Sequence, residues 1–261
     1  METFAYVAVG ALVGLVIGLT GIGGGSLMTP LLIVVFRQSA TVAVGTDLLF
    51  AGLTKLAATL LFGRQRGVDW VVCRQLLYGS LPAALLTLGW MASRSSASPS
   101  ELAVIRPCLA LLLIGSAIAL MAHRFLKVAV ISVDSHRQPL DRHQALLTII
   151  AGLFIGAAVT LTSVGAGALA TAALVYIYSK RLTPARLVAT DIAHALPLTV
   201  VAGIGHSLQG HVDYALLLPL LVGSMPGVWL GTRVAVYAPQ SMLRAIIALM
   251  LAFSGWRLWA G

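Results

Sequence analysis

Two glycine-rich stretches interrupt apolar runs that would otherwise be continuous. They read Gly23-Gly24-Gly25-Ser26 and Gly165-Ala166-Gly167. If each begins a helix inside a membrane, its free backbone N–H groups and partial positive charge would bind an anion. Six nearby hydroxyl groups are candidate donors to that anion, namely Thr20, Ser26, Thr29, Thr162, Ser163 and Thr171. The alternative is that the glycines only allow close helix packing, as predicted for Gly10, Gly14 and Gly18.

Two Thr-Asp pairs place carboxylates inside apolar runs. They are Thr46-Asp47 and Thr190-Asp191. Ionisable side chains at such depth are costly and usually face a cavity. We therefore predict that the aspartates take up protons and that the threonines bind the substrate. Helix capping or a structural hydrogen bond is the alternative, although Pro184 suggests that its helix begins well before Asp191.

Lys55 and His194 are the other polar candidates within these runs. Lys55 is eight residues past Asp47, roughly 12 Å along a helix and too far for direct pairing. It is predicted to attract the anion, with pairing elsewhere or snorkelling as alternatives. His194, one turn after Asp191, is predicted to relay protons, with a hydrogen-bonded core histidine as the alternative.

The residues give little support to an enzyme or a metal protein. Ser26 and His194 could act as nucleophile and base, but no third orienting residue is evident and Ala168 replaces the serine in the second stretch. Cys73 and Cys108 show no metal-ligand spacing. The sequence therefore predicts no catalytic residues, no metal and no cofactor.

The elements that must position these residues are membrane helices. The 261 residues are 59% hydrophobic and 10% charged, with a mean hydropathy of +0.97, and one soluble domain cannot bury that much apolar surface. Several segments approach the roughly 20 residues needed to cross a bilayer. The predicted segments are 4–22, 25–36, 42–62, 71–92 and 102–126, then 145–162, 167–179, 184–205, 214–236 and 240–259. Asp69 and Asp213 are predicted to begin the fourth segment of each half.

An internal duplication relates the two halves. Residues 19–27 and 161–169, shifted by 142, are identical at five of nine positions. A shift of 144 aligns Thr46-Asp47 with Thr190-Asp191 and Gly79-Ser80 with Gly223-Ser224. An odd number of segments per half makes the repeat inverted. The predicted fold is an all-α polytopic membrane protein with two inverted five-segment repeats, each beginning with a hairpin or broken helix pair. Its parts are residues 1–126, a cytoplasmic linker at 127–143, and residues 144–261.

The distribution of basic residues predicts the orientation of the chain in the membrane. Twelve lie on one predicted side, namely Arg64, Arg66, Arg74, Arg124, Lys127, Arg137, Arg142, Lys180, Arg181, Arg186, Arg233 and Arg244. Four lie on the other, namely Arg37, Arg94, Arg106 and Arg257. The positive-inside rule makes the first side cytoplasmic and places both termini outside. The N-terminus, which opens without a basic region, predicts no cleaved signal peptide. Because the charges lie in short turns, a nucleic-acid partner is not expected despite the net charge of +9.

The motifs resemble those of the sulfite exporter TauE/SafE family, also called the toluene sulfonate uptake permease family. The likeness rests on the duplicated glycine stretch, the Val-Gly-Thr-Asp and Val-Ala-Thr-Asp sites and the Gly-Ser-x-Pro that follows, and it covers nearly the whole chain. The resemblance implies an inner-membrane permease for sulfite, sulfoacetate or other organosulfonates, driven by proton exchange or the membrane potential. The family motif carries over to Gly23, Gly24, Gly25, Ser26, Thr46 and Asp47. Ala166 and Ala168 depart from it.

The combined prediction is a secondary transporter that exports sulfite or a small organosulfonate across the bacterial inner membrane. The anion is held at the midplane by helix N-termini. A passive anion channel on the same fold and an uptake permease for sulfonates are the alternatives. Membrane lipid is an expected partner, protons are a candidate coupling ion, and the sequence leaves the oligomeric state open.

Overall fold

The computed structural model describes residues 2–20, 25–62, 67–93, 142–164, 167–178 and 182–234, and scattered residues within 110–118 and 245–259. It is all-helical in these parts. The helices are α1 (Glu2–Thr20), α2 (Gly25–Val34), α3 (Ala40–Phe62), α4 (Trp70–Ser93), α6 (Arg142–Thr162), α7 (Ala168–Tyr178), α8 (Pro184–Leu208) and α9 (Tyr214–Val234). The first four predicted segments of each half are thereby confirmed. Most of the fifth segments and most of the linker at 127–143 lie outside the described residues.

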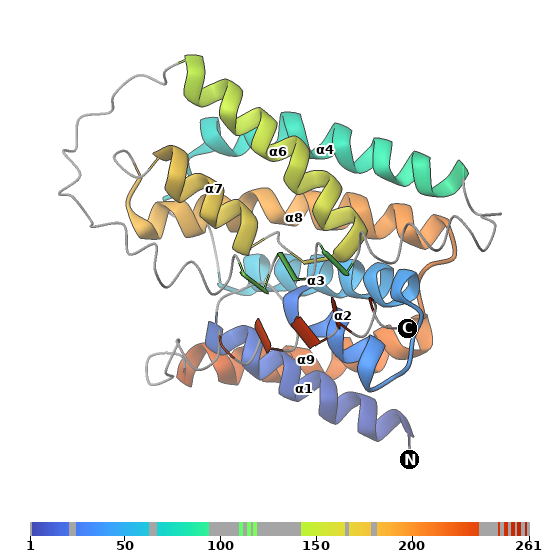
Figure 1. Ribbon diagram of the computed structural model, residues 1–261. Coiled ribbons are helices and arrows are strands. Elements are labelled where there is room, and N and C mark those ends of the chain that lie inside the picture. The colour runs from blue at the N-terminus through green and yellow to red at the C-terminus, as the bar shows by residue number, and fades with distance from the viewer. Residues whose placement is uncertain are drawn as a thin grey trace.

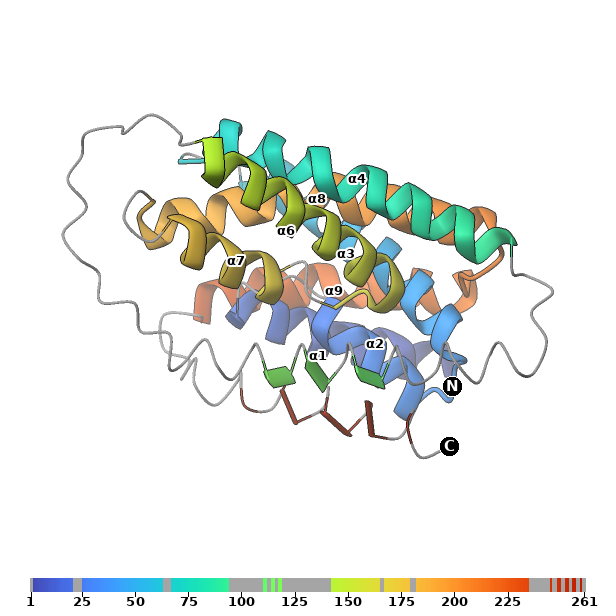
Figure 2. The ribbon, with the colours of Figure 1, turned by 45° about the horizontal axis from the view of Figure 1, so that its top comes forward.

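The helices form two packed groups on either side of α3. Figures 1 and 2 show α4, α6, α7 and α8 on one side of it, and α1, α2 and α9 on the other. One hydrophobic core joins α3 to the first group and includes Leu48, Leu76 and Leu198. A second core joins α3 to the second group and includes Phe50, Met28 and Leu220. Each group therefore contains helices from both predicted halves.

Small residues bring the backbones of two helix pairs into contact. Gly14 of α1 lies against Ser224 of α9, and Gly156 of α6 lies against Ser80 of α4. A Cβ atom at either glycine would overlap the backbone of its partner, so only a residue without a side chain fits. Gly10 packs in the same way against Leu220. The predicted close packing at Gly10 and Gly14 is confirmed.

These contacts recur at equivalent positions of the duplicated sequence. Gly14 and Gly156 differ by the 142-residue offset, and Ser224 and Ser80 by the 144-residue offset. The third helices of the two halves, α3 and α8, run antiparallel, because Gly45 lies against His206 while Gly52 lies against Val200. Recurrent contacts of this kind are expected of a duplicated chain. The inverted orientation of the halves and their boundaries stay predictions.

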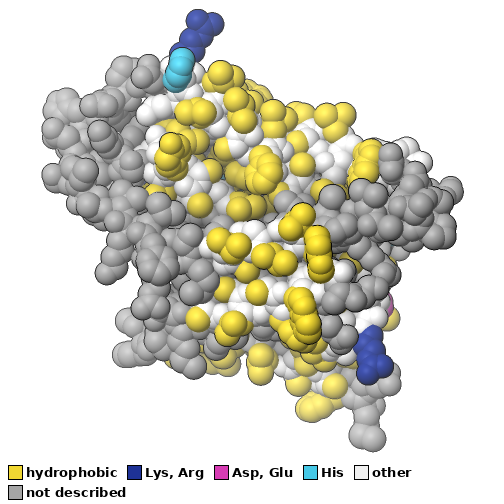
Figure 3. Space-filling view, viewed as in Figure 1, with side chains coloured by type: hydrophobic (Ala, Val, Ile, Leu, Met, Phe, Trp, Pro, Cys, Tyr) yellow, Lys and Arg dark blue, Asp and Glu magenta, His cyan; other side chains and the backbone are white. Residues whose placement is uncertain are grey.

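The outer surface fits a lipid environment. Among the described residues α4, α6 and the part of α9 from Tyr214 to Gly231 are long and apolar enough to cross a membrane. Figure 3 shows apolar side chains spread over one face of the molecule, with basic side chains only near the edges of the part drawn in colour. Large apolar side chains such as Leu86 and Phe154 are exposed on these helices. The chain is a membrane protein.

Side-chain caps start three of the helices. The Asp69 carboxylate accepts hydrogen bonds from the backbone N–H groups of the second and third residues after it, at 3.2 Å each. Asp213 does the same before α9, at 3.0 and 3.2 Å. Thr183 caps α8, whose first residue is Pro184. These caps satisfy amides that a helix start leaves unpaired, so the predicted helix starts at Asp69 and Asp213 are confirmed.

Candidate functional site

The Asp47 carboxylate is held by the short helix α2. Its Oδ2 atom accepts hydrogen bonds from the Thr29 backbone N–H at 3.0 Å and from the Thr29 hydroxyl at 2.5 Å. Both residues are fully buried. The contact joins the middle of α2, three positions after the first glycine stretch ends at Ser26, to the eighth residue of α3. A carboxylate in this position has one oxygen fixed and the other available.

Asp191 repeats the arrangement in the second half. Its Oδ2 atom accepts a hydrogen bond from the Thr171 hydroxyl at 2.9 Å. Thr171 lies at the start of α7, just after the second glycine stretch, and its backbone N–H donates to Gly167 O instead of to the carboxylate. The two Thr–Asp contacts use equivalent residues, but the first has one hydrogen bond more.

Along the antiparallel pair of α3 and α8, Lys55 is at a level between Asp47 and Asp191. Asp47 and Asp191 each occupy the eighth position of their helix, and the antiparallel packing of α3 and α8 places them toward opposite ends of the pair. Lys55 interacts electrostatically with both aspartates. The distance along α3 disfavours direct pairing with Asp47, and α8 supplies Asp191 as a second partner for the charge. One ammonium group thus offsets part of two buried negative charges.

Ser163 extends the site from the end of α6. Its backbone has φ 58°, an uncommon left-handed conformation for a residue other than glycine, and its side chain is 2% exposed. The hydroxyl lies near the Asp47 carboxylate but forms no hydrogen bond with any of the described residues. Ser163, which lies beside the second glycine stretch, is therefore near Asp47, the aspartate bonded to the helix that follows the first glycine stretch.

Four buried polar atoms of this region have no hydrogen-bond partner among the described residues. They are Asp47 Oδ1, Asp191 Oδ1, Ser163 Oγ and His194 Nδ1. Leaving such a group unpaired costs about 1–3 kcal/mol, and protein interiors rarely tolerate several together. Atoms of this kind are available to a ligand, a proton or water.

His194 lies one turn after Asp191 on the same face of α8, and its partner is in α4. Its Nε2 atom forms a hydrogen bond of 2.9 Å with the Ser80 hydroxyl of α4, and the histidine is fully buried. The equivalent residue in the first half is Phe50, which lies in the second hydrophobic core. Ser80 is a partner that the sequence did not reveal, since nothing in it relates positions so far apart in the chain.

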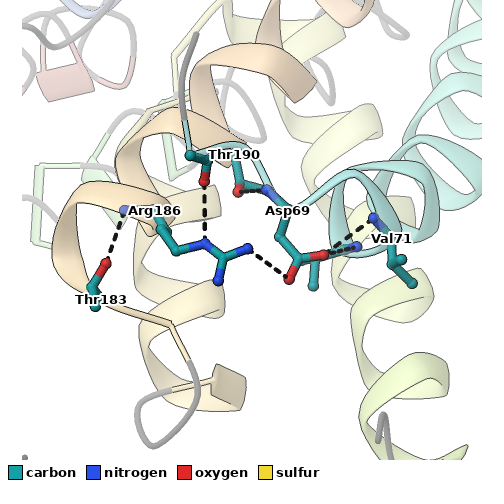
Figure 4. Close-up of polar contacts among 7 residues, drawn as sticks. Asp69, Val71, Thr183, Arg186 and Thr190 are labelled. Atoms are coloured by element: carbon teal, nitrogen blue, oxygen red, sulfur yellow. Dashed lines mark hydrogen bonds and ion pairs between the residues drawn. The ribbon is translucent and has the colours of Figure 1, made fainter. Parts of the chain in front are cut away.

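Thr46 and Thr190 tie the two halves together. The Thr46 hydroxyl accepts a hydrogen bond from the Asp213 backbone N–H at 3.0 Å, and the Thr190 hydroxyl accepts one from the Asp69 backbone N–H at 2.9 Å. Figure 4 shows the second contact, where Arg186 also approaches the Asp69 carboxylate at 3.8 Å. Each threonine precedes a site aspartate, so each contact reaches from the site to a turn of the other half. Substrate binding by these threonines stays a prediction.

Removing either threonine hydroxyl is expected to destabilise the protein. Thr190→Val leaves the buried Asp69 amide without an acceptor and should lower the free energy of unfolding by about 1–3 kcal/mol. Thr46→Val should have a smaller effect, because the Asp213 contact is only partly buried. Thermal unfolding of the purified variants measures both, with Thr41→Val as the control, since the only hydrogen bond that we find for the Thr41 hydroxyl among the described residues is exposed. Equal midpoints for all three variants would contradict the assigned contacts.

The predicted site residues are only partly placed. Gly23, Gly24, Gly165 and Ala166 lie outside the described residues, as do the side chains of Thr20 and Ser26. Gly25 begins α2 and Gly167 immediately precedes α7. Three of the predicted anion donors have other partners: Thr29 and Thr171 donate to aspartates, and the Thr162 hydroxyl donates to Ala158 O at 2.7 Å. The described residues bring together Asp47, Thr29 and Ser163 around one carboxylate, and Asp191 and Thr171 around the other.

Comparison with known proteins identifies the family. The profile of the family described as "Sulfite exporter TauE/SafE" matches residues 6–258. The Bacillus subtilis protein "Probable membrane transporter protein YjnA" is 35% identical over 252 residues, which cover 97% of this chain and 98% of that one. "Probable membrane transporter protein YdhB", from the same organism, is 27% identical over 94% of this chain and 95% of its own. No solved structure shows significant similarity. With a match over nearly its whole length, this chain belongs to the sulfite exporter TauE/SafE family of membrane transporters.

Proposed function

We propose that the protein is a secondary transporter that exports sulfite or a small organosulfonate across the bacterial inner membrane. One observation carries the proposal, namely the two Thr–Asp contacts that attach α2 to α3 and α7 to α8. Each contact lies near a glycine stretch, and Lys55 is at a level between the two. Family membership supports transport and a small anion as the cargo.

The charges of the site favour coupling to protons. Asp47 and Asp191 outnumber Lys55, so an anion that enters while both aspartates are ionised adds to an excess of buried negative charge. Buried charges of one sign are costly unless they are neutralised. Protonation of the aspartates would remove the excess and let Oδ1 of each donate a hydrogen bond to an anion oxygen. His194 is the candidate relay for these protons.

In addition to the protonated aspartates, the N-termini of α2 and α7 attract the anion. α2 begins at Gly25 and α7 at Ala168, and the N-terminus of a helix presents unpaired N–H groups and a partial positive charge. The predicted binding residues of these stretches are Gly23, Gly24, Gly25, Ser26, Thr20, Ser163, Gly165, Ala166 and Gly167. We place the anion beside the N-termini of α2 and α7, between the two Thr–Asp contacts.

The moving parts are the two packed groups of helices rather than the two halves of the sequence. α1, α2 and α9 share one core, and α4, α6, α7 and α8 share the other, with α3 contributing to both. Rocking of one group against the other around α3 would expose the site alternately to each side. By the positive-inside rule, both termini are periplasmic.

Transport by purified protein in liposomes tests the proposal. Proteoliposomes should accumulate sulfite or sulfoacetate when a proton gradient is imposed, and the anion flux should be coupled to a flux of protons. Absence of flux and binding for sulfite, sulfate, thiosulfate, sulfoacetate and taurine would reject the transporter.

Two alternatives give different results in the same experiment. A passive anion channel would show conductance without proton movement. An uptake permease would move the anion with the same coupling but would support growth on the external sulfonate instead of resistance to internal sulfite. Growth assays in cells therefore determine the direction of transport, and proteoliposomes determine whether anion transport is coupled to protons.

A further inference from the structure

A second polar cluster lies at the end of α8, apart from the residues of the candidate site. His206 occupies the last turn of α8, and Gln209 and His211 lie in the turn that leads to α9. The two imidazole rings are 5.6 Å apart between centroids, and His206 is fully buried. The equivalent residues of the first half are Phe62 and Gly67. The histidine pair is thus a titratable feature of one half only.

Hydrogen-bond partners fix which atoms of the cluster carry protons. His206 Nε2 is 2.9 Å from the Thr160 carbonyl oxygen, which can only accept, so Nε2 carries the hydrogen and Nδ1 of the neutral ring is an acceptor. Gln209 Nε2 donates to the Leu88 carbonyl oxygen at 3.0 Å, which leaves its Oε1 as an acceptor. In the part of the chain that the structure describes, these two acceptors and His211 Nδ1 are buried without a hydrogen-bond partner.

Backbone hydrogen bonds such as that from the His211 N–H to the His206 carbonyl oxygen at 2.9 Å hold the closed turn, but three of its buried side-chain atoms stay unpaired among the described residues. Each buried polar atom without a partner costs about 1–3 kcal/mol, whereas water could supply donors to all three if the turn opened. His211 lies next to the exposed Gly210, so its ring is close to the solvent-exposed surface. Burial lowers the pKa of His211, because a charged imidazole loses hydration inside the protein.

The cluster is connected to the candidate site through α3. The His211 carbonyl oxygen and the His206 Cβ atom lie directly against Gly45, where an added Cβ would overlap them. Gly45 precedes Thr46, whose hydroxyl holds the Asp213 amide. A movement of the turn would thus act on the backbone that carries Thr46 and the site aspartate after it.

We propose that His206 and His211 form a proton-binding site that opens the turn between α8 and α9 and releases the Thr46–Asp213 hydrogen bond. A proton on either ring places a charge in a cluster that has no negative group among its own members, and two charged rings this close would repel each other. The closed turn keeps His211 neutral, so its stability is present above the ordinary histidine pKa and is lost as the pH falls below it. The Thr190–Asp69 contact at the other end involves Arg186 and no histidine, and should not respond.

Charged and titratable groups near the cluster come from three elements. The turn before α9 and the start of that helix contribute Asp213 and Tyr214. In α3, Asp47 is two residues after Gly45, which lies against both histidines, and in the turn before α3, Arg37 precedes Gln38, which donates to Asp213. The Asp213 carboxylate already accepts hydrogen bonds from Gln38 and from two amides of α9. Among the described residues, α4 and α6 meet the cluster with the carbonyl groups of Leu88 and Thr160.

Hydrogen exchange of the full-length protein in lipid nanodiscs tests the proposal. At about pH 5.5, amides 209–213 of the wild type should exchange about tenfold faster than at about pH 7.5, after correction for the intrinsic rate. His211→Gln keeps a polar, neutral side chain and should remove this dependence, with His206→Gln as a second variant. His143→Gln, which changes an exposed histidine at the start of α6, should behave like the wild type.

Three results would overturn the proposal. They are equal pH dependence in wild type and His211→Gln, fast exchange of His211→Gln at both pH values, and an equal response of amides 67–69 at the opposite contact. If neither variant folds, 13C-histidine NMR of the wild type decides, because the proposal requires a histidine transition at the pH where the turn opens. The readout needs no transported substrate, so its failure is distinguishable from failure of the proposed function.

Discussion

Asp47→Asn is expected to lower proton-coupled anion flux by at least about a hundredfold, the scale at which removal of a positioned proton-transfer group usually acts. Asparagine has nearly the shape of aspartate, and its side-chain oxygen can still accept both hydrogen bonds from Thr29. The substitution therefore removes the exchangeable proton and the charge while it keeps the attachment of α2. Flux that remains should no longer vary with pH.

The equivalent change in the second half provides the comparison. Asp191→Asn should weaken the pH dependence of the flux, and its side-chain oxygen can still accept the hydrogen bond from Thr171. Initial rates in proteoliposomes over a range of pH measure both variants, and thermal unfolding shows whether each is folded. Wild-type flux with an unchanged pH profile in Asp47→Asn would remove Asp47 from the mechanism.

Gly223→Val should abolish the packing of α1 against α9. A Cβ at Gly223 would overlap the carbonyl oxygen of Val7, and backbone atoms of a packed helix cannot move aside as a flexible side chain can. We expect a loss of about 3 kcal/mol or more, at the upper end of what overpacking costs, which is a large part of the stability of a typical protein. Gly79→Val should have a comparable effect on α4 and α6, because its Cβ would overlap Ile149 O.

Gly89→Ala is the matched control for these substitutions. Gly89 lies in α4 like Gly79, but an added Cβ there meets nothing within 4 Å. Alanine in place of glycine within a helix should leave stability unchanged or raise it by roughly 0.5–1 kcal/mol. Size-exclusion profiles and thermal midpoints in detergent distinguish the three variants. A monodisperse Gly223→Val with the midpoint of the wild type would show that the α1–α9 contact is looser than described.

The sequence predicted the helices well because their signals are local. Long apolar runs, glycine-rich interruptions and the capping residues Asp69 and Asp213 gave segment limits within a few residues of those observed for α3, α4, α8 and α9. The same holds for Gly10 and Gly14, whose spacing alone indicates a packing face.

The partners within the site could not be predicted in the same way. Their place beside the glycine stretches predicts Thr29 and Thr171 as donors to an anion, but their hydroxyls donate to the aspartates. No spacing rule relates a residue of α2 to one of α3. Thr46 and Asp213 are far apart in sequence, and so are Ser80 and His194, so their contacts depend on how the helices pack. The sequence repeat does relate the Thr46 and Thr190 contacts to each other once one of them is known.

The exchange of helices between the halves has a consequence for biosynthesis. α1 packs on α9, and α6 packs on α4, so α1 meets its permanent neighbour only after the helices between the two have been made. Until then lipid or an insertion factor must contact the glycine-containing face of α1 that later packs against α9. A chain cut within the linker should consequently give two fragments that mature only when they are produced together, since neither holds both members of either pair.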